Sequence, residues 1–176
     1  FSRLKMLSRE ELADVEKIDT LEAAYRQCEA ELGPIDILIL GAAANFPAPA
    51  EQMSASGFAK VIDVDLKGSF NAARAAFSQL KKTRGSIIFI SATNSLMPFA
   101  FQCHVGAAKA GMDSLMRGLA LEWGPHGIRC KSILPGPIEN TEGLGRLLTS
   151  EDVETLRDYI PIGCFGTIDD VAAVAA

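Results

Sequence analysis

Three short apolar runs, separated by long helical patterns, constrain the fold of this chain more than any other feature. The runs cover residues 35–40, 87–90 and 128–134, and each predicts a buried strand. Over residues 54–82 and 105–123, apolar side chains recur at the three- and four-residue steps of amphipathic helices. This alternation of strands and helices predicts an α/β fold with a parallel sheet and crossover helices.

The chain reads as a single domain over residues 1–176. A further helix is expected from about Thr20, stopped by Gly33 and Pro34. There are no internal repeats, linkers or low-complexity tracts, and 176 residues suffice for one sizeable core. The sequence starts at Phe1 and its last residues stop in mid-pattern, so we expect an interior piece of a longer chain.

Composition argues against several classes of function. A formal net charge of -5 without a basic run argues against nucleic acid as a partner. No apolar stretch approaches the ~20 residues of a membrane span, and no signal peptide is recognisable at the start. The scattered cysteines indicate reduced thiols of a cytoplasmic protein, with no disulfide framework and no metal site. They are Cys28, Cys103, Cys130 and Cys164.

Small and polar residues follow all three predicted strands, at residues 41–45, 91–93 and 135–138. In a parallel sheet, ligands bind at the carboxyl ends of the strands. Ordinary turn chemistry would explain any one of these segments. The three together, opposite the start of a helix that carries Lys109, favour a nucleotide or cofactor cleft.

Lys109 stands isolated among small residues near the start of its helix. Gly106, Ala107, Ala108, Ala110 and Gly111 surround it, and such neighbours allow another body to approach the backbone closely. One interpretation is a ligand held by the lysine. The other is a close helix–helix crossing with Lys109 extending into solvent.

Several motifs resemble the short-chain dehydrogenase/reductase family, in order and at the spacing of that family. They are residues 36–43 (DILILGAA), residues 63–68 (DVDLKG), Ser91 at a strand end, Ala108-Lys109, and residues 135–138 (PGPI). The resemblance implies a Rossmann-type doubly wound sheet, a nicotinamide cofactor, a small-molecule substrate and a homo-oligomer, either a dimer or a tetramer. The glycine-rich phosphate loop of the family and its closing strand do not occur in this sequence.

The resemblance also implies a set of cofactor-binding residues. Arg3 would pair with the 2′-phosphate of NADP, which favours NADP(H) over NAD(H), and Asp14 with Val15 would touch the adenine. Lys109 would hold the nicotinamide ribose. The remaining cofactor-binding residues are Gly41, Ala42, Ala43, Pro135, Gly136 and Ile138.

This sequence departs from the family at the positions that perform carbonyl chemistry. The catalytic tyrosine position, four residues before Lys109, is Val105, and the serine position is Ala92. The asparagine of the kinked helix is Asp65. The two tyrosines of the chain, Tyr25 and Tyr159, stand elsewhere. Proton donation from a phenol to an alkoxide is therefore excluded.

Within the family, the sequence looks most similar to the peroxisomal type of 2,4-dienoyl-CoA reductase. Features shared with that branch include residues 43–46 (AANF), His104, residues 121–125 (LEWGP) and residues 141–144 (TEGL). The implied reaction is hydride transfer from NADPH to a conjugated acyl-CoA, followed by protonation from a water that Asp65 orients beside Lys109. These two residues are the expected catalytic residues, and a eukaryotic protein would be peroxisomal.

The substrate-binding residues expected from this resemblance are Asn45, Phe46, Ser91, Thr93 and His104. For His104, a helix-capping role is the alternative. Two other functions stay open for the whole chain. One is a catalytically silent homologue that binds nucleotide or acts structurally, and the other is a conventional carbonyl reductase.

Overall fold

The computed structural model describes residues 13–141, 144–145 and 150–176. Its sheet contains β1 (Ile37–Leu40), β2 (Ser86–Ile90) and β3 (Arg129–Ile133), in the order β1-β2-β3. Both strand pairs are parallel: Ile37 lies opposite Ser86, which in turn lies opposite Arg129. The predicted parallel sheet is confirmed, although the first strand begins at Ile37 rather than at residue 35.

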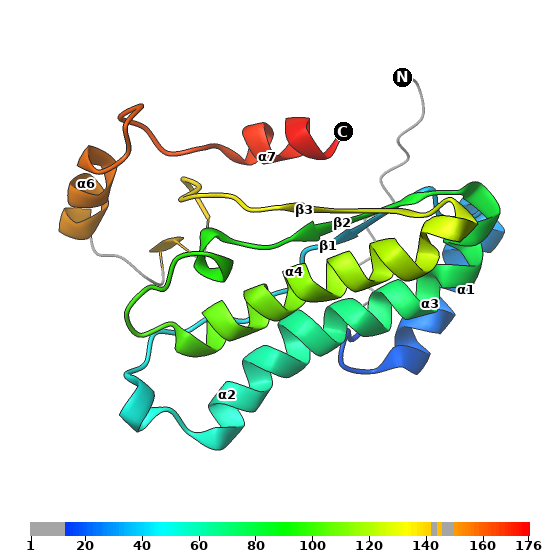
Figure 1. Ribbon diagram of the computed structural model, residues 1–176, viewed down its shortest axis with the longest axis horizontal. Coiled ribbons are helices and arrows are strands. Elements are labelled where there is room, and N and C mark those ends of the chain that lie inside the picture. The colour runs from blue at the N-terminus through cyan, green and yellow to red at the C-terminus, as the bar shows by residue number, and fades with distance from the viewer. Residues whose placement is uncertain (1–12, 142–143, 146–149) are drawn as a thin grey trace.

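Two long helices, α3 (Gly68–Thr83) and α4 (Cys103–Trp123), run along one face of the sheet (Figure 1). The shorter α7 (Ile168–Ala175) lies on the other side, beside β3. The remaining helices are α1 (Ile18–Leu32), α2 (Ala55–Val61) and α6 (Ser150–Asp158), with short turns η1 (Ala50–Gln52), η3 (Thr93–Ser95) and η4 (Gly124–His126). No helix in the described ranges combines the length and apolarity needed to cross a bilayer.

The hydrophobic core lies between the sheet and the long helices. Leu40, Ile87 and Phe89 point from the sheet towards Leu80 of α3 and Met112 of α4. Burial of each such side chain contributes about 1.5–3 kcal/mol of transfer free energy. The opposite face of β1 is different, because Ile37 is 53% and Ile39 54% exposed. The apolar run of β1 therefore predicts more burial than the described residues provide, whereas β2 is buried along most of its length.

The long helical pattern expected over residues 54–82 is interrupted by a π-helical segment, η2 (Ile62–Lys67). Ser54 caps the first part by accepting a hydrogen bond from the Gly57 N–H at 3.0 Å. A π-helical turn holds an extra residue, and such turns occur often at functional sites. Asp65 lies in this segment and is fully buried, and the Ser69 hydroxyl donates to its backbone carbonyl at 2.5 Å.

We expect Gly85→Ala to lower the free energy of unfolding by about 1–3 kcal/mol, because the added methyl group overfills the start of β2. A Cβ at Gly85 would lie 2.4 Å from the carbonyl oxygen of Asp36. This oxygen belongs to the backbone, so it cannot move away as the end of a flexible side chain could. Gly118→Ala on α4 is the control, since apart from the adjoining helix backbone no described atom lies within 4 Å of the added carbon. Urea unfolding of the full-length protein would measure both, and equal stability of the two variants would contradict this packing.

Candidate active site

The carboxyl ends of the three strands meet at one edge of the sheet. The segments that follow them are residues 41–45, 91–93 and 135–138. Ser91 N–H donates to the Ile133 carbonyl at 2.9 Å, which ties the second segment to the end of β3. Gly41, Ala42 and Ala43 are exposed at this edge. The parallel pairing therefore brings the three predicted segments together.

A buried ion pair joins the two residues expected to be catalytic. Lys109 Nζ lies 3.2 Å from Asp65 Oδ2, with Lys109 6% exposed and Asp65 fully buried. The same ammonium group donates to the Ile90 carbonyl, at the end of β2, at 3.1 Å. The interpretation that places Lys109 in solvent is therefore wrong.

The small residues around Lys109 do serve close packing. Ala108 is fully buried, and a Cβ at Gly111 would approach Leu66 Cδ2 to 2.8 Å. The lack of side-chain bulk lets η2 lie directly against α4. The close helix packing of the second interpretation is therefore confirmed, whereas the ligand that the first interpretation assigns to Lys109 stays a prediction.

The loop after β1 completes the surroundings of Asp65. Ala44 N–H donates to Asp65 Oδ1 at 2.7 Å, so the carboxylate has one hydrogen-bond donor and one cation as partners. Ala44 and Phe46 also pack against a small apolar cluster of Val61, Val105 and Ala108. The carboxylate is thus held by two separate elements, the loop after β1 and α4, and this fixes its orientation.

Buried polar atoms without a hydrogen-bond partner gather at this edge of the sheet. Within the described residues they include Asn45 Oδ1, Ser91 Oγ, Ser95 Oγ and both ring nitrogens of His104. Proteins rarely leave such groups unpaired, and each needs an explanation such as a ligand or ordered water. Ser95, at the end of η3, was not among the residues expected from sequence, because a lone serine in a loop carries no distinguishing signal.

His104 is the second residue of α4 and is fully buried. Its ring lies against Phe46, with a centroid distance of 4.6 Å and an interplanar angle of 50°. The residue that precedes the helix is Gln102, and it makes no side-chain capping bond. The capping role considered for His104 is therefore wrong.

The structure places no phenol at the positions that carbonyl chemistry requires. Val105 is buried in the apolar cluster, and Ala92 immediately precedes η3. Tyr25 lies on α1 beside the hydrophobic core, where burial, with a smaller contribution from Cys28, raises the pKa of its phenol to about 12. Tyr159 is 80% exposed, just after α6.

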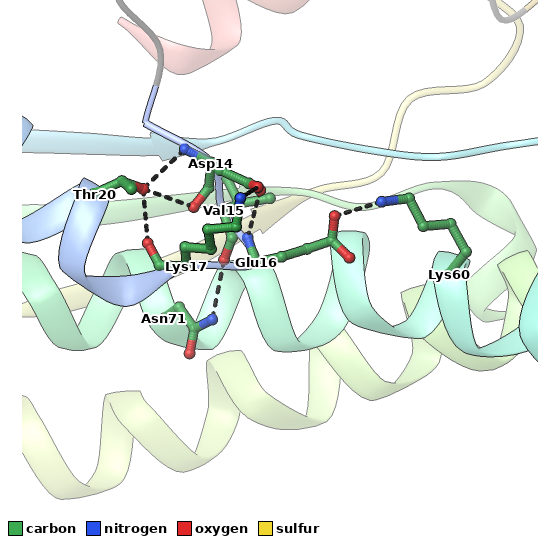
Figure 2. A network of polar contacts seen from close by, with 7 residues as sticks. All are labelled: Asp14, Val15, Glu16, Lys17, Thr20, Lys60 and Asn71. Atoms are coloured by element: carbon green, nitrogen blue, oxygen red, sulfur yellow. Dashed lines mark hydrogen bonds and ion pairs between the residues drawn. The ribbon is translucent and has the colours of Figure 1, made fainter.

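The turn at Asp14 and Val15 is fixed against the helices that follow β1 (Figure 2). Asn71 Nδ2 of α3 donates to the Val15 carbonyl at 3.0 Å, and Lys60 of α2 pairs with Glu16. Glu16 N–H donates to Asp14 Oδ1 at 3.0 Å. This hydrogen bond and the neighbouring Lys17 lower the pKa of Asp14. The contact of this turn with adenine stays a prediction.

The third segment is closed by contacts of its own. Ile138 forms a parallel bridge with Gly166, and the Thr141 hydroxyl donates to the Ile138 carbonyl at 2.8 Å. Thr93, expected in the substrate site, begins η3. Arg3, together with Glu142 and Gly143 of the motif at residues 141–144, lies outside the described residues. The ligand contacts expected of Pro135 and Gly136 stay predictions.

A family model described as enoyl-(acyl carrier protein) reductase matches residues 9–176. The chain belongs to this branch of the short-chain dehydrogenases/reductases. This short-chain dehydrogenase/reductase is 45% identical to a peroxisomal 2,4-dienoyl-CoA reductase of Saccharomyces cerevisiae that produces a (3E)-enoyl-CoA. That match covers 90% of the chain and 54% of the yeast protein.

Two further comparisons agree with the family. A probable 2,4-dienoyl-CoA reductase of Bacillus subtilis is 38% identical, over 93% of the chain and 66% of that protein. A gluconate 5-dehydrogenase of Burkholderia cenocepacia, solved with NADP and tartrate, has a TM-score of 0.86 at 28% identity and covers 93% of the chain. The chain spans 64% of that solved structure and about half of the yeast relative. The Rossmann-type fold is thereby confirmed for this part of the family domain.

We expect Lys109→Met to lower the free energy of unfolding by about 3–5 kcal/mol, because it leaves the Asp65 carboxylate buried without its cation. Adding Asp65→Asn should restore most of the loss. Lys67→Met is the matched control, since Lys67 pairs with Asp63 at 3.3 Å in an exposed position, and it should change stability little. Chemical denaturation measures the free energy of unfolding of all three variants. Equal losses of stability in Lys109→Met and Lys67→Met would contradict the burial of the Asp65–Lys109 pair.

Proposed function

We propose that the protein is an NADPH-dependent reductase of a conjugated enoyl- or dienoyl-CoA thioester. The observation that carries the proposal is the buried Asp65–Lys109 pair in a site where Val105 and Ala92 replace the hydroxyl groups of carbonyl chemistry. The names of the relatives, which describe 2,4-dienoyl-CoA reductases, support this substrate class. They do not support a conventional carbonyl reductase.

The residues at the strand ends fit a nicotinamide dinucleotide. Residues 41–43 are small and exposed, and a Cβ at Gly41 would meet only Ile90 Cγ1, at 3.8 Å. An ammonium group has three donors. Lys109 donates a hydrogen bond to the Ile90 carbonyl. It lies 3.2 Å from Asp65 Oδ2 as an ion pair without a hydrogen bond, so donors are left for a ribose hydroxyl. A bound cofactor of this kind would supply a hydride, and Pro135, Gly136 and Ile138 would lie beside it.

Asp65 would act by holding a water rather than by donating its own proton. An ionised carboxylate only accepts hydrogen bonds, and its two oxygens offer about four acceptor positions. The Ala44 N–H occupies one of them, whereas Oδ2, which pairs with the Lys109 charge, accepts no hydrogen bond within the described residues. A water on a remaining position could give a proton to a carbon of the enolate and regain one from the solvent, while Lys109 offsets the negative charge nearby.

Donors to the thioester oxygen are also available at this edge. The Ser91 and Ser95 hydroxyls are buried and have no hydrogen-bond partner within the described residues. A well-placed donor to a developing oxyanion commonly contributes about 3 kcal/mol. We assign Ser91, Thr93, Asn45 and Phe46 to the substrate side of the site. We also propose the homo-oligomer, dimer or tetramer, that the family resemblance implies.

We expect the full-length protein to oxidise NADPH with 2,4-hexadienoyl-CoA and to leave ketones and aldehydes unreduced. Asp65→Asn should lower kcat about 100-fold or more with little change in cofactor affinity, because the proton-delivering water is held less well. Asp65→Ala should lower it further. The exchange Asp63→Asn, at the neighbouring exposed carboxylate, is the matched control and should leave kcat unchanged.

Two outcomes of this assay would overturn the proposal. Turnover of ketones alone would support a carbonyl reductase. Absence of turnover with every substrate, by protein shown to bind cofactor, would support the catalytically silent homologue.

We also expect tighter binding of NADPH than of NADH, because Arg3 can form a bidentate pair with the 2′-phosphate. Fluorescence titration of both cofactors measures this, and Arg3→Ala should remove the difference. Arg26→Ala, at an exposed position on α1, is the control. Equal affinity for both cofactors in the unchanged protein would show that Arg3 has no such role.

A further inference from the structure

The imidazole of His104 is enclosed by protein, yet it has no polar partner in the described part of the chain. The residue is 0% exposed, and both of its ring nitrogens are buried without a hydrogen bond. An imidazole carries at least one N–H in every protonation state. Buried groups of this kind nearly always find a partner, and a buried water is a common one.

Three consecutive residues connect this imidazole to Asp65. Ala44 N–H donates to Asp65 Oδ1 at 2.7 Å, and Phe46 lies against the His104 ring at 4.6 Å between centroids. Asn45 stands between them, and its Oδ1 is buried without a partner among the residues that the structure describes. Two residues of extended chain span at most about 7 Å. An unpaired acceptor therefore belongs to the residue between the Ala44 hydrogen bond and the Phe46 contact, and an unpaired imidazole lies against Phe46.

The burial of the ring nitrogens also limits what His104 can do. Both are shielded from solvent, so a ligand reaches them only if the residues that cover them move, which also holds for the buried Ser91 and Ser95 hydroxyls. A direct role in substrate binding, expected from the sequence, would require such a movement. If His104 instead acts indirectly, by holding the loop at residues 44–46, the loop does not have to move.

We propose that His104 is a positioning residue that shares a buried water with Asn45. The water bridge, together with the Phe46 contact, holds residues 44–46 so that the Ala44 N–H keeps the Asp65 carboxylate in its orientation. Only the kinetic consequence of this inference rests on the proposed function. The bridge itself is a property of the folded protein.

Kinetics of the full-length protein with NADPH and 2,4-hexadienoyl-CoA test the consequence. His104→Phe keeps the ring against Phe46 but removes both nitrogens, and Asn45→Ala removes the proposed acceptor. Each should lower kcat about 10- to 100-fold, since small misplacements of catalytic groups have effects of this size. The double variant should be no slower than the slower single variant, because both changes remove one bridge, and cofactor affinity should change less than about twofold.

The second histidine of the chain provides a matched control. His126 also lies against a phenylalanine, Phe77, at 5.5 Å between centroids, but at the far end of α4. His126→Phe should leave kcat unchanged. Full kcat in His104→Phe, or strictly additive losses in the double variant, would overturn the proposal.

Nuclear magnetic resonance of the full-length protein with ¹⁵N-labelled histidine tests the bridge without any turnover. The chain has two histidines, so the His104 signal is identified by its loss in His104→Phe. We expect a slowly exchanging imidazole N–H with a cross-peak to a long-lived water, and a shift of that N–H in Asn45→Ala. A rapidly exchanging N–H, or one that Asn45→Ala leaves unchanged, would overturn the bridge. If the unchanged protein turns over no substrate, the proposed function fails, and this measurement alone decides the bridge.

Discussion

The buried ion pair between Asp65 and Lys109 is the interaction on which the rest of this site depends. Removing two charges from water is unfavourable by several kcal/mol per ion, and the attraction between them offsets this only when further hydrogen bonds are present. The fold provides these from separate elements. The Ile90 carbonyl comes from β2 and the Ala44 N–H from the loop after β1, while the π-helical segment η2 carries Asp65 to within 3.2 Å of the lysine.

Much of this arrangement could be predicted from the sequence, because the pattern of apolar residues determines the order of strands and helices. That order in turn places the segments after β1, β2 and β3 at one edge of the sheet. Lys109 could be singled out because its neighbours are so small. The exposed face of β1 was not predicted, since an apolar run does not reveal what covers it, and Ile37 and Ile39 are more than half exposed among the described residues.

Other features were beyond sequence reasoning for physical reasons. The spacing of apolar residues over 54–82 predicts one continuous helix, and only the family resemblance implied a kink at Asp65, without its π-helical geometry. The partners of Lys109 include a backbone carbonyl, and every residue has one. The unpaired hydroxyl of Ser95 and the enclosed ring of His104 depend on the tertiary packing of loops, which composition and periodicity do not encode.

The departures from the family pattern and the geometry of the site are consistent with each other. An apolar residue at position 105 and an alanine at position 92 remove proton donors, and the buried carboxylate of Asp65, which we propose holds a water in their stead, lies beside Lys109. The relatives named as 2,4-dienoyl-CoA reductases share this part of the domain at 38–45% identity. The names of these relatives give a 2,4-dienoyl-CoA as the compound reduced and an enoyl-CoA as the product.

The most direct test of this account follows the two hydrogens into the product. The full-length protein would be given 2,4-hexadienoyl-CoA, once with NADPH deuterated at the transferred position and once with ordinary NADPH in deuterium oxide, and the product analysed by mass spectrometry. The account predicts an enoyl-CoA that gains one carbon-bound deuterium from the cofactor in the first reaction and one from the solvent in the second. A product reduced at the carbonyl group, or one without solvent deuterium, would contradict it.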